Sequence, residues 1–387
     1  MSESKYAQRG VSAGKEDVHK AIKNLDKGLY PNAFCKILPD LAAGDANYVN
    51  IMHADTAGTK TSLAYLYWKE TGDVSVWEGI VQDAMVMNLD DMACAGMTND
   101  FILSSTIGRN KNLVDGSVVV ALIGAQKKLA DKMAEFGVNL HLAGGETADV
   151  GDIVRTADVG FTAFGRLPKA DVIDINIKEG DVIVGLASYG QASYEDEYNS
   201  GIGSNGLTFA RHEVLLKAYA DKYPDSFDPN LNENVVYTGK SFLTDSFEDA
   251  PLNIGKMLLS PTRTFVPVLK AVIEKHRSQI NGIIHNTGGG LAKVLHFAGD
   301  VSIQKNKPLP IPPVFRMIQQ QTGAPWQEMF QVFNMGQRIE FYVPAEIADS
   351  IIEISKSFNI HAQVMGHVQK GPKEVVVRHG DLEYVYK

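Results

Sequence analysis

Several acidic residues in the N-terminal half have the types and the spacing of a site for a cation and a phosphate. Asp55 lies in the stretch "HADTAGTKTS", shortly before Lys60. Asp83 and Asp90 are seven residues apart in "DAMVMNLDD", about two helical turns, so they share one helix face, whereas Asp91 is rotated by roughly 100°. Mg²⁺ takes one or two carboxylates and completes its shell with water and phosphate oxygens. We therefore predict magnesium at Asp55, Asp90 and Asp91, although solvated helix residues would show the same spacing.

The loop that carries Asp55 differs from a standard phosphate-binding loop. In the pattern G-x-x-x-x-G-K-[ST] the second glycine directly precedes the lysine, so that backbone N–H groups surround a phosphate. Here Thr59 separates Gly58 from Lys60, and the first glycine is missing. We therefore expect a phosphate to be bound through Lys60 and a cation rather than by the backbone alone.

A second candidate lies in "LAGGETAD", where a predicted strand ends in two glycines and an acid. Gly144 and Gly145 allow a close approach of the backbone, and Glu146 and Thr147 then face the ligand. An ordinary turn from a strand into a loop would look the same.

Two glycine-rich loops of the C-terminal half, residues 203–206 and 287–290, each precede a predicted helix. The N–H groups and the dipole at a helix N-terminus favour anions, although a plain helix cap or a flexible connector has the same composition. A lone histidine such as His285 is more often structural than catalytic. The candidate ligand contacts of this half are Ser204, Asn205, Gly206, Thr262, Arg263, Thr287, Gly288 and Gly289.

Strands and helices that alternate along the chain position these residues. The patterns predict a strand over residues 47–55, helices from about residue 61 and over 77–92, a strand in "FILSSTIG", and a helix that Asp115 caps and that ends before Gly137. Strands in "VNLHLAGGET" and "TADVGFTAFGRLP" follow, and a short helix is expected from about Asp17. A helix "NGLTFARHEVLLKAYA" and a final hairpin belong to the second half. We expect an α/β or α+β fold with domains at 1–167 and 168–387.

Composition limits the class of protein. The 387 residues are 44% hydrophobic and 21% charged, which suits two domains with sizeable cores. The net charge of −9 argues against nucleic acid or an anionic membrane as a partner. Two cysteines, Cys35 and Cys94, are too few for a disulfide framework, and no export signal or membrane-spanning run is visible. We expect a cytoplasmic protein.

The sequence contains eight ordered blocks: "ADTAGTK", "LDDMACAG", "LAGGETAD", "DVGFTAFG", "SNGLTFAR", "LLSPTRTFV", "HNTGGGL" and "FNMGQRIEFYVP". In order and spacing they resemble the family of aminoimidazole ribonucleotide synthetase, also called phosphoribosylformylglycinamidine cyclo-ligase. The resemblance covers almost the whole chain from about Tyr6, and the related superfamily includes formylglycinamidine ribonucleotide synthetase, selenophosphate synthetase and thiamine-monophosphate kinase.

The resemblance implies two α/β domains and a homodimer in which the N-terminal domains pair their sheets, with ATP in a nearby cleft. It also implies Mg²⁺ and a ribonucleotide substrate. The implied catalytic residues are Lys60, Asp91 and His285. The implied ATP contacts are Asp55, Gly58, Thr59, Lys60, Asp91, Gly144, Gly145, Glu146 and Thr147.

Three positions depart from the family pattern. Thr56 stands for the first glycine of the family's D-G-V-G-T-K loop, Asp90 for an asparagine, and Gly203 for the histidine of H-S-N-G. An acidic, aromatic stretch that includes residues 194–198 precedes Gly203. Either His212 or a residue of that stretch replaces the imidazole, or the reaction does not need it.

The resemblance implies ATP-dependent ring closure of formylglycinamidine ribonucleotide. Phosphorylation of the amide oxygen makes it a leaving group, an internal amidine nitrogen attacks, and His285 is the candidate that takes the proton. A related small-molecule kinase of the thiamine-monophosphate type and a degenerate nucleotide-binding protein remain the alternatives.

Overall fold

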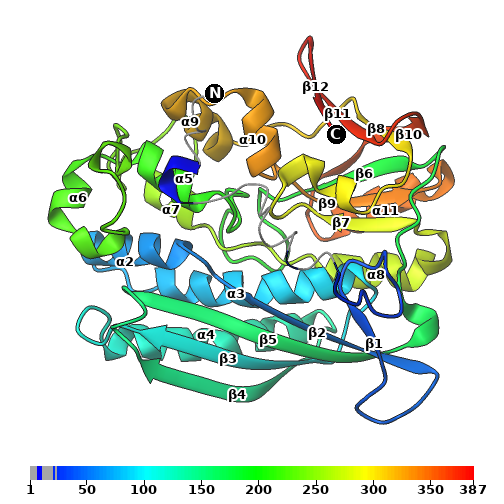
Figure 1. The fold of residues 1–387 in the computed structure, drawn as a ribbon, viewed down its shortest axis with the longest axis horizontal. Helices are drawn as coiled ribbons and strands as arrows, with labels where there is room; N and C mark the ends of the chain where they lie inside the picture. The colour runs from blue at the N-terminus through cyan, green and yellow to red at the C-terminus, as the bar shows by residue number, and fades with distance from the viewer. Residues whose placement is uncertain (1–6, 11–20, 22–23) are drawn as a thin grey trace.

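Two β-sheets organise the chain, one in each half, in a mixed α/β architecture (Figure 1). The computed structural model describes residues 7–10, 21 and 24–387, so the helix expected from Asp17 lies outside the described residues. Short 3₁₀ segments include η1 (Ala7–Arg9), η2 (Lys169–Asp171), η3 (Pro224–Ser226), η4 (Glu233–Val235), η5 (Arg277–Gln279) and η6 (Gly290–His296).

The N-terminal sheet has five strands in the order β1-β2-β5-β3-β4. Neighbours are antiparallel except for the parallel pair β3 and β4. Its strands are β1 (Ile37–Pro39), β2 (Tyr48–Thr56), β3 (Phe101–Arg109), β4 (Leu140–Asp149) and β5 (Ala157–Pro168). Its helices are α2 (Lys60–Thr71), α3 (Val76–Cys94) and α4 (Gly116–Glu135).

The C-terminal sheet has seven strands in the order β12-β11-β8-β10-β6-β9-β7, antiparallel except for β8 and β11. The strands are β6 (Val182–Ala187), β7 (Gly282–His285), β8 (Val301–Lys305), β9 (Gln337–Val343), β10 (Ala362–Lys370), β11 (Glu374–His379) and β12 (Leu382–Tyr386). The helices are α5 (Leu207–Val214), α6 (Ala218–Lys222), α7 (Ile254–Leu259), α8 (Val266–His276), α9 (Pro313–Thr322), α10 (Trp326–Val332) and α11 (Ala345–Ser357).

Helix α3 joins the two halves, because it packs on β2 and β5 of one sheet and on α8 and β7 of the other half (Figure 1). A helix that is covered on both sides needs buried residues around most of its circumference. Accordingly Trp77, Met85 and Leu89 are fully buried, and so are the polar residues Asp83 and Asp90. Polar groups in such a position require partners from the structure around them.

Most of the elements predicted in the N-terminal half are confirmed. Asp115 caps α4 by accepting a hydrogen bond from the Ser117 N–H at 2.8 Å. The predicted end of a strand at Gly144 and Gly145 is wrong, because β4 continues to Asp149. Gly144 has a φ of +86° at an irregularity in the pairing of β3 with β4, so the glycines form a bulge inside the strand.

The long helix expected in "NGLTFARHEVLLKAYA" is interrupted. Helix α5 ends at Val214 and α6 begins at Ala218. Between them, Leu215 and Leu216 form bridges with Ser241 and Gly239, and the Leu216 N–H donates to the Ser241 carbonyl at 3.1 Å. This long-range pairing of the backbone outweighs the local helical preference.

One face of the N-terminal sheet carries an exposed apolar row. His53 contacts α3, so Met52, its neighbour in β2, points to the opposite face. Met52 is paired with Phe164 of β5, and Phe164 is paired with Ile102 of β3. Met52 is 63% exposed and Ile102 is 44% exposed.

In the part of the chain that the structure describes, no helix is long and apolar enough to cross a bilayer.

Candidate active site

Lys60 lies in the interior at the first residue of α2 and is fully buried. Its Nζ donates to Asp83 Oδ1 at 2.9 Å, to the Gly203 carbonyl at 3.1 Å and to the Ser260 carbonyl at 2.5 Å. Burial lowers the pKa of Lys60, and the charge of Asp83 opposes that shift. An ammonium group has three N–H donors and all three have protein acceptors. The expected contact of Lys60 with a phosphate therefore does not fit this geometry; the residue links the two halves of the chain.

Asp83 receives a second set of bonds from the C-terminal half. Its Oδ1 accepts from the Thr262 N–H at 2.7 Å, from the Thr262 hydroxyl at 2.6 Å and from the Ser204 hydroxyl at 3.0 Å. Thr262 and Ser204 were expected to contact a ligand, and they bind this buried carboxylate instead. Asp83 Oδ2 is buried and has no hydrogen-bond partner among the described residues.

Asp90 lies on the same face of α3, as the sequence predicts, and binds the same segment. Asp90 Oδ1 accepts from the Thr264 hydroxyl at 2.7 Å, and both its oxygens accept from the Phe265 N–H, at 3.1 and 3.0 Å. Burial raises the pKa of Asp90 to about 7, against the opposing effect of these bonds. The oxygens of Asp90, predicted as a metal ligand, are thus bound by Thr264 and Phe265, and this geometry does not favour coordination of a metal ion.

Asp91 lies on the adjacent face and contacts two histidines. His285 Nδ1 is 2.7 Å from Asp91 Oδ1, and His53 Nε2 is 3.6 Å from Asp91 Oδ2. Burial would raise the pKa of Asp91, but the bond and charge of His285 hold it below the usual value. His53 was not singled out from the sequence, although it opens the stretch "HADTAGTKTS". Its Nδ1 is 2.9 Å from Asn88 Oδ1.

The bonds of His285 define its protonation. Arg338 Nε donates to His285 Nε2 at 3.0 Å, so Nε2 acts as an acceptor and the ring proton is on Nδ1, where it faces Asp91. Burial, with a further contribution from Arg338, lowers the pKa of His285 to about 4. The expected role of His285 as the group that takes a proton does not fit, because its lone pair already binds Arg338.

Arg338 is a functional candidate that sequence reasoning missed, although its block "FNMGQRIEFYVP" was recognised. Arg338 is the second residue of β9 and is 1% exposed. The carboxylates of Asp83, Asp90 and Asp91 lie near its guanidinium group. Its Nη2 contacts Met87 Sδ at 3.4 Å, whereas its Nη1 is buried without a hydrogen-bond partner in the described part of the chain.

Arg263 was expected to bind the substrate and instead binds the acidic stretch before Gly203. Its Nε donates to Glu195 Oε1 at 2.9 Å and its Nη2 to Glu195 Oε2 at 2.5 Å. Its Nη1 donates to the carbonyls of Ala187 and Tyr189, both at 2.9 Å. Such a bidentate pair with a carboxylate leaves little of the guanidinium for a ligand. Glu195 belongs to the acidic stretch that includes residues 194–198. Its negative charge was the one feature of the sequence that indicated a basic partner.

Tyr194 fixes the same stretch from the other side. Its hydroxyl donates to the Thr264 carbonyl at 2.6 Å, and its ring packs edge-on to Phe136 and Phe358. The stretch therefore connects the end of α4 with the C-terminal half and with the segment that binds Asp83 and Asp90.

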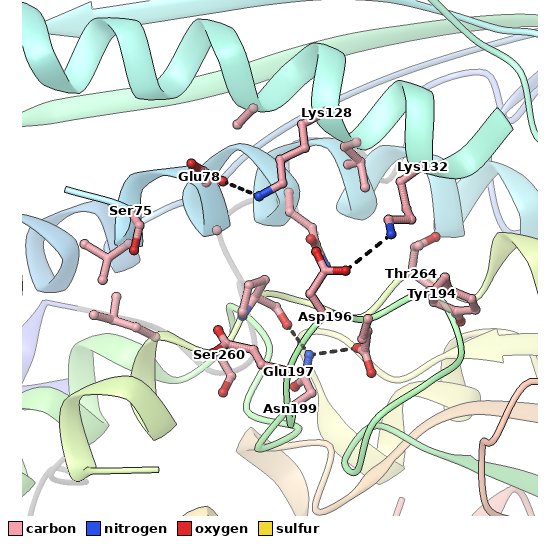
Figure 2. A pocket seen from close by; sticks show the side chains of 18 of the residues that line it. Ser75, Glu78, Lys128, Lys132, Tyr194, Asp196, Glu197, Asn199, Ser260 and Thr264 are labelled. Carbon is pink, nitrogen blue, oxygen red and sulfur yellow. Dashed lines mark hydrogen bonds and ion pairs between the residues drawn. The ribbon is translucent and has the colours of Figure 1, made fainter. Parts of the chain in front are cut away.

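A cavity of about 400 Å³ lies beside this stretch. Figure 2 shows Lys128 of α4 paired with Glu78 of α3, and Lys132 of α4 paired with Asp196. These four residues line the cavity, whereas the expected ligand residues of the two glycine-rich loops are not part of its lining.

The two glycine-rich loops lie close to each other. A Cβ built on Gly288 would be 3.7 Å from Asn205 Nδ2, and Asn205 Oδ1 is buried without a partner among the described residues. Gly206 and Gly289 have φ angles of +76° and +99°, which glycine adopts without strain. Thr287 Oγ1 accepts from Lys293 at 3.4 Å. The sequence thus placed a helix start correctly at α5, whereas the second loop opens the 3₁₀ segment η6.

The remaining expected ATP contacts lie in the N-terminal half, at the end of β2, in the turn that follows it, and within β4. Asp55 and the exposed Gly58 flank the turn between β2 and α2, and Thr59 Oγ1 is 2.7 Å from Thr208 Oγ1 of α5. The β4 residues Gly144, Gly145, Glu146 and Thr147 are exposed. No group of three His, Cys, Asp or Glu side chains that could hold a metal ion occurs in residues 7–10, 21 and 24–387.

His212, the alternative source of an imidazole, lies elsewhere. Its ring is fully buried beside Tyr237, and its Nδ1 accepts from the Tyr237 N–H at 3.3 Å. Burial lowers the pKa of His212 to about 2. His212 therefore belongs to the packing of α5 and does not face the segments that bind Asp83 and Asp91.

The fold is a mixed α/β architecture with one sheet in each half, and the candidate residues Asp83 and Asp90 of α3 bond to the C-terminal half. The chain belongs to the family of AIR synthase related proteins: the N-terminal domain of that family matches residues 39–167 and its C-terminal domain matches residues 178–379.

Two curated relatives carry the name phosphoribosylformylglycinamidine cyclo-ligase. The one from Methanococcus vannielii is 30% identical over 355 residues, which cover 90% of this chain and 84% of that protein. The one from Caldicellulosiruptor saccharolyticus is 29% identical over 391 residues, which cover 96% of this chain and 99% of that protein.

Solved structures share the fold. A chain of the HypE-HypF complex matches with a TM-score of 0.57 and 16% identity, covering 97% of this chain and 99% of that chain. PurLQS from Thermotoga maritima matches with a TM-score of 0.51 and 11% identity over 96% of this chain, which spans only 48% of that chain. At these identities the similarity establishes the fold alone.

Proposed function

We propose that this protein closes the imidazole ring of formylglycinamidine ribonucleotide with ATP, giving aminoimidazole ribonucleotide, ADP and phosphate. The observation that carries this proposal is the similarity to relatives named phosphoribosylformylglycinamidine cyclo-ligase across both domains and nearly their whole length. The fold alone would not distinguish this activity from others in the same superfamily.

The reaction has two group-transfer steps. The amide oxygen of the formyl group attacks the γ-phosphorus of ATP, so that one O–P bond forms and the bond to ADP breaks. The amidine nitrogen then forms a bond to the formyl carbon, the C–O bond breaks, and phosphate leaves with that oxygen. The attacking nitrogen loses one proton. Positioning and neutralisation of charge supply most of the catalysis of phosphoryl transfer.

The interface between the domains is where we place this chemistry. The segment 260–265 of the C-terminal half lies along α3 and is held by Lys60, Asp83 and Asp90. A substrate bound by one domain and ATP bound by the other meet there only if these contacts hold the two domains in this relative position. In our proposal residues 1–167 bind ATP and residues 168–387 bind the ribonucleotide. Lys60 and Asp83 then act by holding the two together.

A magnesium ion is expected with ATP, where it would neutralise charge on the phosphates. The structure argues against Asp90 as its ligand. Asp55, at the end of β2, and Asp91, whose side chain is 13% exposed, are the two carboxylates of the predicted set that still fit. A site with only two carboxylates would leave the other positions to water and phosphate oxygens.

We also propose a homodimer through the exposed face of the N-terminal sheet. The row formed by Met52, Phe164 and Ile102 crosses three strands on the face opposite α3. Contiguous apolar surface of this kind favours association, and a second copy offers a matching sheet face.

The test is a product assay with ATP and formylglycinamidine ribonucleotide, run beside thiamine phosphate. We expect ADP, inorganic phosphate and aminoimidazole ribonucleotide in equal amounts with the first substrate and no ADP with the second. Transfer of the γ-phosphate onto thiamine phosphate would instead identify a kinase. Binding of ATP without substrate-dependent ADP release would indicate a degenerate nucleotide-binding protein.

A further inference from the structure

Gly203 stands where the family pattern has a histidine, and Arg338 fills the space beside it. A Cβ built on Gly203 would lie 2.1 Å from Arg338 Nη1, closer than real contacts allow, and 3.0 Å from Arg338 Cζ, which is tighter than most real contacts. Gly203 also has a φ of +70°, which disfavours most side chains. No side chain fits at position 203 while Arg338 keeps this position.

The side chain of Arg338, which belongs to β9, is held by contacts with other segments. Its Nε binds His285 Nε2, its Nη2 contacts Met87, and the whole side chain is 1% exposed. Its Nη1 is directed at the Gly203 loop and has no hydrogen-bond partner among the described residues. A buried N–H of a charged group is costly without an acceptor, so this atom calls for an oxygen that the protein does not provide.

The residues around Gly203 are the ones that join the two domains. Lys60 donates to the Gly203 carbonyl, and the next residue, Ser204, donates to Asp83. Asp83 Oδ2 is a further buried atom without a partner in the described chain. Arg338 therefore ends in the loop that separates the ATP-binding half from the substrate-binding half.

We propose that Arg338 replaces the missing imidazole of this family member by a fixed positive charge. In this proposal, which rests on the proposed ring closure, Arg338 Nη1 binds an oxygen of the phosphoryl group that passes from ATP to the substrate. A guanidinium stays protonated, so Arg338 stabilises the developing negative charge and transfers no proton. Rigid donors of this kind act without reorganisation during the reaction.

Three variants test the exchange of Gly203 and Arg338. Arg338→Gly is expected to lower kcat by roughly 10²–10³-fold, as for loss of one donor to a developing oxyanion. Gly203→His alone is expected to lower kcat similarly, because the new side chain collides with Arg338. In the double variant, the large side chain is at position 203 and the glycine at position 338, so the two positions again hold one large and one small residue. We expect its kcat to exceed that of Arg338→Gly at least tenfold, with a new dependence on pH near the pKa of histidine, about 6.5.

Lys305→Met is the matched control. Lys305 is another fully buried cation, paired with Glu340 at 2.6 Å in the core of the C-terminal sheet. Its loss is expected to lower Tm while kcat for the folded enzyme stays within about twofold of the parent, since Lys305 is outside the interface. If Lys305→Met lowered kcat as much as Arg338→Gly, the effect would be one of stability and the proposal would be wrong.

A binding measurement separates this inference from the proposed function. Calorimetry with a non-hydrolysable ATP analogue is expected to show at least tenfold weaker binding by Arg338→Gly than by the parent, whatever the acceptor substrate proves to be. Equal affinity together with full turnover of Arg338→Gly would show that Nη1 binds only water, which overturns the inference. Failure of the parent to turn over formylglycinamidine ribonucleotide while the analogue still binds through Arg338 would overturn the proposed function alone.

Discussion

Replacing Lys60 by methionine tests whether the ammonium group joins the domains or serves a ligand. Lys60 and Asp83 have 0% exposed side chains, and their charged atoms are 2.9 Å apart. Removing the lysine leaves the Asp83 carboxylate buried without its cation, while Thr262 and Ser204 still donate to it. Breaking a buried pair in this way costs about 3–5 kcal/mol in the free energy of unfolding.

The matching change on the other side is Asp83→Asn. It keeps an oxygen for the Thr262 and Ser204 donors but removes the charge, so Lys60 becomes the unpaired ion. In the double variant neither charge remains. The two free-energy losses are therefore expected to be non-additive, with a coupling of about 1–3 kcal/mol in favour of the double variant.

Thermal unfolding of the four proteins measures this coupling. At roughly 2–4 °C per kcal/mol, the loss in Lys60→Met corresponds to a fall in Tm of about 6–20 °C without any ligand present. The double variant is expected to unfold at a temperature closer to that of the parent than the sum of the single changes implies. An unchanged Tm for Lys60→Met, together with weaker ATP binding, would refute the structural role and restore the phosphate contact inferred from the sequence.

Three further outcomes are expected. The pKa of Asp90, about 7 in the folded protein against 3.8 as its ordinary value, means that the folded state binds the proton more tightly, so stability falls as pH rises from about 4 to 7. Asp90→Asn is expected to remove that decline, which comes to about 3 kcal/mol between pH 5 and pH 8, in urea unfolding at those two pH values; a parallel decline in the variant would contradict the burial argument. His285 is expected to stay neutral with its proton on Nδ1 from pH 5 to pH 8, which nitrogen NMR of labelled histidine measures; a protonated ring at pH 6 would be inconsistent with the Arg338 bond. Met52→Lys, at a 63% exposed position, is expected to convert a dimer into monomers by light scattering, whereas an unchanged mass would exclude this sheet face as the interface.

The sequence predicted the helix that carries the acidic residues of the site, but it did not predict the hydrogen-bond partners of those residues. The seven-residue spacing of Asp83 and Asp90 correctly placed both on one helix face. Their partners are Thr262 and Phe265, more than 170 residues later in the chain. A local spacing cannot distinguish a carboxylate that awaits a metal from one that binds a distant backbone, because both are acidic residues on an apolar helix.

Contacts between residues far apart in the sequence explain the positions at which the chain departs from the family pattern. The glycine at position 203 is explained by Arg338, 135 residues away, and the acidic stretch by the bidentate bond of Glu195 to Arg263. Burial of Lys60 was equally hidden, since a lysine at the start of a helix normally suggests exposure. Thr56, which replaces another family glycine, donates its backbone N–H to Asp55 at 2.8 Å, and its Oγ1 accepts from the Gly58 N–H at 3.2 Å, so the side chain supports the turn between β2 and α2.

The fate of the formyl oxygen tests the central claim most directly. Formylglycinamidine ribonucleotide labelled with ¹⁸O in the formyl group is incubated with ATP and the enzyme, and the phosphate is analysed by mass spectrometry. Ring closure through a phosphorylated amide predicts one ¹⁸O atom in each phosphate released, in step with ADP. Unlabelled phosphate, or ADP formed without any aminoimidazole ribonucleotide, would contradict it.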